Sequence, residues 1–236
     1  MSAKKRFYTT VDVSEDAAGF GVTLDGRAVR SPAGTLAQMP SRPLAEAVAA
    51  EWQAQEQEIE PASMPLFSLT VTVIDRVTPQ RAAILHELEA YGGNDLLCYH
   101  DSDDAALAAR QQTGWMPWID WARDSLGADL QVATGIMPVS QSPAARAALA
   151  EAAASFDDWV LGMLHRTVTL GGSLVLGLAF LKGRMDANAL FEAAFLDELW
   201  QAEKWGSDWE AEDRRAGIKS ELADAERFLH LVRVSG

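Results

Sequence analysis

The chain has 236 residues, of which 48% are hydrophobic and 23% charged, and its formal net charge is −14. This length suits one large domain or two small ones, and the composition supports a packed core rather than a disordered chain. The strong negative charge argues against nucleic acid or an anionic membrane as the main partner. A basic or polar protein surface fits the charge better.

The single cysteine and the first residues bear on the cellular compartment. With Cys98 alone, the chain can form no intrachain disulfide, which is typical of proteins from a reducing compartment. The N-terminus, MSAKKRFYTT, has no apolar run and no long Arg/Ser-rich amphipathic leader. We therefore expect a bacterial cytoplasmic protein, or a mature form.

Strand signals are concentrated at the beginning of the chain. β-forming residues predict strands at Lys5–Ser14 and Phe20–Leu24. Asp25-Gly26 is a strong two-residue hairpin signal before a third short strand at Ala28–Arg30. Ser41 is then expected to cap a helix, whose apolar stripe consists of Leu44, Val48 and Trp52.

The segment Ser68–Val77 is ambiguous by pattern alone. Leu69, Val71 and Val73 alternate as in a strand, whereas four apolar residues also have helical spacing. The β-branched composition favours the strand. The four apolar residues with helical spacing are Leu66, Leu69, Val73 and Val77.

After Thr78 the pattern is helical. Thr78-Pro79 predicts an N-cap and a first helical position, with the helix running to Tyr91. A brief strand is expected at Leu130–Val132. A stretch of fifteen uncharged residues between Arg166 and Lys182 predicts the central core element, and its glycines indicate close helix packing or a kink. The further helices are expected at Ala105–Leu126, from Pro143 to Ala153, and from Asp157 or Asp158.

The predicted fold class is therefore α+β, with strands first and helices after. We expect residues 1–77 to form an antiparallel β-rich unit with one or two helices. Residues 78–236 are expected to form an all-helical unit.

The segment from Asp186 to Asp213 has the highest charge density in the chain. It contains nine carboxylates and one cation, Lys204, so its net charge is −8. Glu198 interrupts the apolar stripe of a predicted helix that ends at Gly206. Ser207 and Glu210 resemble a capping box that starts the next helix, and Glu210 can pair with Arg214. The apolar stripe that Glu198 interrupts consists of Phe191, Phe195, Ala202 and Trp205.

No catalytic or metal-binding pattern is present in the sequence. None of the four histidines lies three or four residues from another, and no nucleophile-elbow, phosphate-loop or zinc signature occurs. Cys98 lies in an apolar run and is expected to be structural. We therefore predict a non-enzyme with no cofactor and no metal. The alternative is a small carboxylate-dependent hydrolase that uses Glu198, Asp208 and Glu210.

Several motifs, in this order along the chain, resemble one known family. They are KRFY, LDGRAVRSPAG, EWQAQ, MPLF followed by IDRV, NDLLCY, RQQTGWMPWIDWA, GIMPVSQ, GSLVLGLA and DELWQAEKWG. The family is the assembly chaperone of the ATP synthase catalytic head, and the resemblance extends from Arg6 to about Val232. One departure is His100, where the family pattern has arginine.

The resemblance implies a chaperone without catalysis that binds the unassembled alpha subunit and prevents its aggregation. It implies no nucleic acid, no membrane insertion and no small-molecule substrate, and it places eukaryotic members in the mitochondrial matrix. It also favours a helix for Ser68–Val77.

The acidic segment is the predicted partner-binding site. Glu198 needs a cation or water because a carboxylate on an apolar stripe is costly to bury. The local charge would speed encounter with a basic face, and an aromatic side chain beside the helix break could anchor the partner. The alternative is that Glu198 pairs internally with an arginine, such as Arg166 or Arg184, and only holds the fold together. The predicted contact residues are Glu198, Gln201, Trp205, Asp208 and Glu210.

Overall fold

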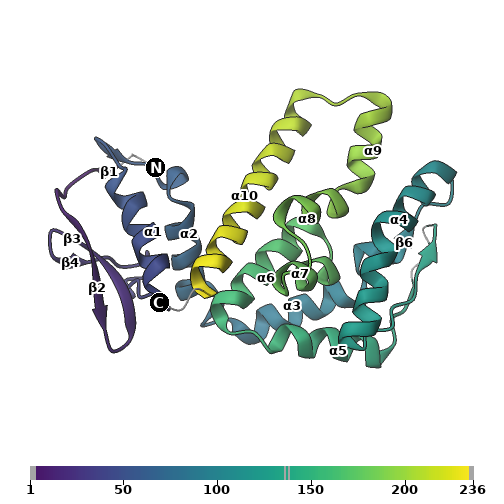
Figure 1. Ribbon diagram of the computed structural model, residues 1–236, viewed down its shortest axis with the longest axis horizontal. Helices are drawn as coiled ribbons and strands as arrows, with labels where there is room; N and C mark the ends of the chain where they lie inside the picture. The colour runs from purple at the N-terminus through teal and green to yellow at the C-terminus, as the bar shows by residue number, and fades with distance from the viewer. Residues whose placement is uncertain (1–3, 136, 138, 234–236) are drawn as a thin grey trace. The chain divides into compact units, whose positions relative to one another are not determined.

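The computed structural model describes residues 4–135, 137 and 139–233 (Figure 1). A small antiparallel sheet is followed by a series of helices, so the predicted α+β class is confirmed. The chain divides into two compact units, which are described separately. The N-terminal unit consists of Met1–Gln80 with Asp224–Gly236, and the helical unit consists of Arg81–Ala223. The sequence pattern, by contrast, places the boundary at Val77 and the whole C-terminus in the helical unit.

The sheet of the N-terminal unit contains β2 (Val11–Asp16), β3 (Gly19–Leu24) and β4 (Arg27–Ala28), in that order and antiparallel (Figure 1). Asp25 and Gly26 both have positive φ, 48° and 76°, as the predicted two-residue hairpin requires. The expected first strand is instead two strands. β1 (Lys4–Lys5) pairs with β5 (Glu58–Ile59), and β2 begins only at Val11.

Helix α1 (Arg42–Gln53) packs on this sheet and begins as predicted. The Ser41 hydroxyl accepts a hydrogen bond from Leu44 N over 3.3 Å, and Leu44, Val48 and Trp52 are all buried. The same hydroxyl donates to the carbonyl of Leu231 over 2.6 Å. This bond attaches the end of the last helix to the N-terminal unit.

Ser68–Val77 is helical, as the resemblance predicted. It belongs to α2 (Pro65–Thr72), which continues into one wide turn, η2 (Val73–Val77). The carboxylate of Glu51 accepts hydrogen bonds from Leu66 N and Phe67 N, each over 2.8 Å. These bonds satisfy donors at the start of α2, so tertiary contacts outweigh the strand propensity of its β-branched residues.

The predicted role of Thr78 as an N-cap is wrong. Thr78 closes η2, because its backbone N–H donates to the carbonyl of Val73 over 3.0 Å. The following helix, α3, begins at Arg81 and ends at Gly93. Helical geometry thus continues through the place where the sequence indicated a start.

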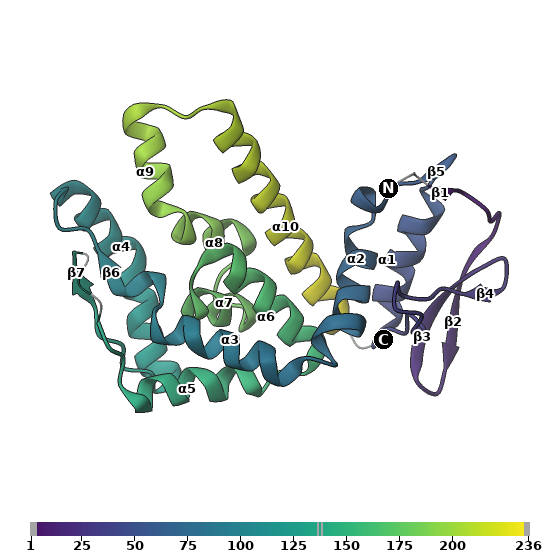
Figure 2. The same cartoon turned by 180° about the vertical axis from the view of Figure 1, so that it is seen from behind.

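The helical unit is built around α6 (Asp158–Gly171) and α7 (Leu174–Leu181) (Figure 2). Every residue of α7 is buried. Gly172 ends α6 at φ 72°, and a Cβ on Gly177 would lie 2.7 Å from a methyl carbon of Val168. The uncharged stretch therefore contains both the kink and the close packing that its glycines indicated. The surrounding helices are α3, α4 (Ala105–Trp121, continued by the wide turn η4, Ala122–Leu126), α5 (Pro143–Ala154), α8 (Ala187–Ala194), α9 (Leu196–Trp205) and the first part of α10 (Trp209–Arg233).

A buried carboxylate joins the segment before α4 to this core. Asp95 accepts hydrogen bonds from Leu97 N (3.1 Å) and Val175 N (3.0 Å). The apolar run that follows is a short 3-10 turn, η3 (Leu96–Cys98), and then β6 (Tyr99–His100). β6 pairs in parallel with β7 (Ala133–Thr134), so the expected strand at Leu130–Val132 lies slightly later. Among the described residues, no helix is long and apolar enough to cross a bilayer.

Candidate functional site

The acidic segment folds into a helical hairpin, which we call the acidic hairpin: α9, the loop 206–208 and the start of α10 up to Arg215 (Figure 1). Two details differ from the sequence prediction. The predicted single helix is interrupted at Phe195, between α8 and α9. Asp208, rather than a Ser207–Glu210 capping box, caps α10, because its Oδ1 accepts from Ala211 N over 2.7 Å.

Two arginines of α10 hold Glu198 of α9. Arg215 Nη1 donates to Glu198 Oε1 over 2.9 Å, and Arg214 donates to Oε2. Arg215, whose side chain is only 11% exposed, also donates to the Ser207 hydroxyl in the loop. Glu198 is therefore paired with arginine inside the chain, as the alternative interpretation held, but its partners are Arg214 and Arg215. Arg166, one of the arginines suggested from the sequence, pairs with Glu221.

The contact with Arg214 also replaces the expected pair of that arginine with Glu210. Burial favours a raised pKa for Glu198, but the hydrogen bonds from Arg214 and Arg215 outweigh it and lower the pKa. Glu198 is thus held as a carboxylate. Its two oxygens already have cationic partners within the chain.

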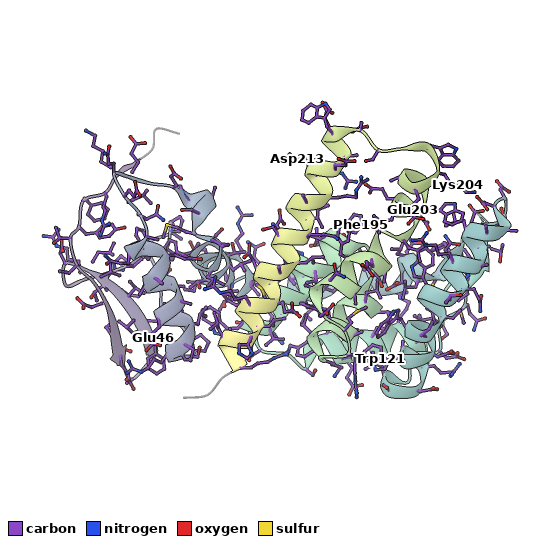
Figure 3. The ribbon with its side chains drawn as sticks, turned by 45° about the horizontal axis from the view of Figure 1, so that its top comes forward. Glu46, Trp121, Phe195, Glu203, Lys204 and Asp213 are labelled. Atoms are coloured by element: carbon purple, nitrogen blue, oxygen red, sulfur yellow. The ribbon has the colours of Figure 1, made fainter. Side chains whose placement is uncertain are left out.

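On its other side, α9 is bound to α4 by polar contacts. Lys204 Nζ donates to Asp104 Oδ2 over 2.6 Å, and Arg110 donates two hydrogen bonds to Glu203. Figure 3 shows Glu203 and Lys204 at the outer end of α9. The Trp200 ring lies under both cations, 4.5 Å from Lys204 Nζ and 5.4 Å from the Arg110 guanidinium carbon.

Deeper along the same contact, the two helices approach closely. Gln111 Nε2 donates to Asp197 Oδ1 over 2.8 Å. A Cβ on Gly114 would lie 2.8 Å from Leu196 Cδ1, so this glycine permits the approach. Together with the Glu198 contacts, these bonds fix α9 between α4 and the start of α10.

Two tryptophans project from the end of this braced hairpin. Trp205 is 75% exposed and Trp209 is 74% exposed, although tryptophan is normally well buried. The predicted apolar stripe is therefore buried only at its beginning, where Phe191 stacks on Phe195 at 4.7 Å. The sequence interpretation missed Trp209, whose only signal was its position three residues after a glycine helix stop among carboxylates.

The exposed tryptophans lie among exposed acidic residues. Glu210, Glu212 and Asp213 are all exposed, and the part of the chain that the structure describes gives them no ion pair. Figure 3 shows Asp213 near the start of α10. An exposed aromatic pair with local negative charge is suited to contact a basic protein surface.

All five predicted contact residues lie on the acidic hairpin. Gln201, Trp205, Asp208 and Glu210 are exposed, whereas Glu198 is part of the ion pair between the helices. The hydrolase alternative finds no support from its three carboxylates. None of them lines the cavities bordered by Tyr91, by Trp52, by Gln55 or by Trp118, and the lowered pKa of Glu198 is opposite to that of a general acid.

Comparison with known proteins gives one consistent family. Residues 5–123 match the family model described as ATP12 chaperone protein. The crystal structure of Atp12 from Paracoccus denitrificans superposes with a TM-score of 0.94 and 41% sequence identity, over 98% of this chain and 99% of that one.

Two curated fungal relatives are more distant in sequence. "Protein atp12, mitochondrial" of Schizosaccharomyces pombe is 22% identical, over 86% of this chain and 75% of its own length. "Protein ATP12, mitochondrial" of Saccharomyces cerevisiae is 25% identical, over 98% of this chain and 83% of its own length.

The family match and the structural superposition define the protein as a chaperone. The chain belongs to the ATP12 chaperone family, the ATP synthase assembly chaperones that its sequence motifs indicated.

Proposed function

We propose that this protein binds the unassembled alpha subunit of the ATP synthase catalytic head and prevents its aggregation until assembly. It acts without catalysis and without a cofactor, in the bacterial cytoplasm. The acidic hairpin is the proposed client-binding surface. Gln201, Trp205, Asp208 and Glu210 supply the contacts, and Glu198 holds the hairpin in shape.

The observation that carries this proposal is the exposure of Trp205 and Trp209 at the end of a braced, acidic hairpin. Burying large aromatic side chains supplies much of the binding energy at protein interfaces. In the free chaperone these two side chains remain in water. A partner that covers them gains this energy.

The ion pairs behind the tryptophans support the same proposal. Arg215 joins α9, the loop and α10, while Lys204 and Arg110 join α9 to α4. A surface that is ordered before binding loses less conformational entropy when the client arrives. The negative charge of the hairpin adds long-range attraction toward a basic client face, which speeds encounter.

An aggregation assay with purified alpha subunit tests the function. Light scattering of the alpha subunit should be suppressed by a stoichiometric amount of the chaperone, and added beta subunit should release the chaperone from the complex. The beta subunit alone, as a matched client, should gain no protection. If alpha and beta subunits are protected equally, the assigned client is wrong.

A further inference from the structure

The N-terminal unit contains an apolar groove that the acidic hairpin does not use. Its volume is about 900 Å³, and it lies among β4 with the turn after it, α1, the short 3-10 turn η1 (Pro61–Ser63) and α2. This is within the range of about 300–1,000 Å³ that is typical of pockets for small ligands. The groove is formed entirely by residues 7–71, so it belongs to this unit alone.

Large apolar side chains line the groove. Trp52 packs edge-on against Phe67 at 5.0 Å, and its Nε1 is buried with no hydrogen-bond partner among the described residues. Val71 of α2 is partly exposed, and Phe7 is 59% exposed. These side chains offer apolar contacts to a partner that enters the groove.

Three charged residues of the described chain line the groove, and two of them are cations. Arg27 and Arg30 are exposed on β4 and on the residues after it, and the exposed Glu60 comes just before η1. The two arginines stand out in a chain of net charge −14. A partner with carboxylates along the edge that faces β4 therefore complements the groove, and one with lysines there is repelled.

We propose that this groove binds an amphipathic helical segment of a partner protein, with its apolar stripe inside the groove and an acidic edge beside Arg27 and Arg30. Such a segment offers apolar side chains at i, i+3, i+4 and i+7, the standard mode of helix-in-groove recognition. The acidic hairpin favours a basic partner surface, whereas the groove favours an acidic one, so the two sites prefer partners of opposite charge. The inference concerns a different site from the proposed client surface and does not depend on the identity of the client.

Synthetic peptides of about four helical turns provide the probe. One has a leucine stripe flanked by glutamates, and its matched partner has lysines in place of the glutamates. Binding is followed by NMR on ¹⁵N-labelled full-length protein through the indole N–H signal of Trp52, assigned with Trp52→Phe. The glutamate peptide should shift this signal saturably, and the lysine peptide should bind at least about tenfold more weakly, because like charges across an interface are strongly unfavourable.

Three substitutions locate the binding. Val71→Glu places a charge in the groove and should abolish binding. Phe7→Glu should do the same at a position that is 59% exposed. Arg27→Glu should remove most of the preference for the glutamate peptide, because the new carboxylate offsets the charge of Arg30. Arg76→Glu is the matched control, because Arg76 is exposed in the same unit and does not line the groove.

Any one of three results would overturn the inference. They are the absence of a saturable shift of the Trp52 signal, equal affinity for the two peptides, and binding that survives both Val71→Glu and Phe7→Glu. A concentration-dependent dimer that Phe7→Glu dissociates would instead assign the groove to self-association. A Trp205→Ala/Trp209→Ala protein should still bind the peptide, so failure of the hairpin proposal is distinguishable from failure of this one.

Discussion

Arg215 and Glu198 lie 17 residues apart in sequence and join the two helices of the acidic hairpin through a 2.9 Å hydrogen bond. The Arg215 guanidinium is largely buried, and it also reaches the loop at Ser207. The contacts of Glu198 with Arg214 and Arg215, together with the Arg215–Ser207 hydrogen bond, therefore hold the hairpin together, and we call them the clasp. Glu198 therefore stabilises the conformation of the acidic hairpin.

The first prediction concerns this clasp. Glu198→Lys should lower the melting temperature by several degrees, because it places a third cation beside Arg214 and Arg215 and removes hydrogen bonds to a charged group worth roughly 1.5–3 kcal/mol. Differential scanning calorimetry measures the shift. Glu212→Lys, an exposed position on the same hairpin, is the control and should melt like the unmodified protein. Equal melting temperatures for the two variants would show that the clasp does not stabilise the fold.

The same ion pair predicts a pH dependence. The folded-state pKa of Glu198 is below its ordinary value of 4.5, so its stabilising effect is fully present above that value and is lost as the pH falls through the lower, folded pKa. The stability difference between the unmodified protein and Glu198→Gln should therefore be constant near neutral pH and shrink in acid. Urea unfolding at a series of pH values tests this. A difference that grows in acid would contradict the assigned direction.

The second prediction separates binding from stability. Trp205→Ala combined with Trp209→Ala should leave the melting temperature nearly unchanged, because both side chains are about three-quarters exposed. Protection of the alpha subunit should fall strongly, since truncation of an aromatic anchor costs about 2 kcal/mol or more, roughly a thirtyfold loss of affinity. Met137→Ala, at a residue 73% exposed elsewhere in the same unit, is the control. Unchanged protection by the double variant would move the client surface away from the hairpin.

Salt gives an independent check on the same surface. Association with the client should slow as salt concentration rises, because the attraction of exposed charges is screened beyond about 8–10 Å at physiological ionic strength. Stopped-flow measurement of association with the alpha subunit gives the rate. A rate that does not change with salt would argue that the acidic residues of the hairpin do not guide encounter.

The third prediction concerns the buried Asp95. Asp95→Ala leaves the N–H groups of Leu97 and Val175 without their acceptor inside the helical unit, and each unsatisfied donor costs about 1–3 kcal/mol. We expect a loss of roughly 3–5 kcal/mol in the free energy of unfolding, measured by urea denaturation. Asp129→Ala, at an exposed position, should cost little. Similar losses for both variants would show that the carboxylate is dispensable to the core.

The fourth prediction is that Cys98 is structural. Burial and the nearby Asp95 raise the pKa of the Cys98 thiol to about 12, so the thiol is protonated and unreactive at neutral pH. Iodoacetamide should modify the folded protein far more slowly than the urea-unfolded chain, as followed by mass spectrometry. Cys98→Ala should protect the alpha subunit normally. A folded Cys98→Ala protein that fails to protect it would give the thiol a functional role.

Local patterns in the sequence predicted much of the fold. The Asp25-Gly26 turn, the Ser41 cap and the uncharged core stretch each depend on interactions among neighbouring residues, which spacing and residue type specify directly. The acidic segment was likewise identified as the place where charge and aromatic residues coincide. The order of the motifs along the chain was sufficient to indicate the family.

Tertiary structure decided the features that depend on distant residues. Thr78 does not start a helix, because it closes the preceding wide turn. The partners of Glu198 were misassigned because several arginines were available. Spacing cannot choose among them, since the choice depends on which helix face α10 turns toward α9. The sequence by itself determined the local elements and the charge of the hairpin. Only the packing of α4, α9 and α10 decided which charges are paired within the chain and which side chains, Trp205 and Trp209 among them, remain exposed to a partner.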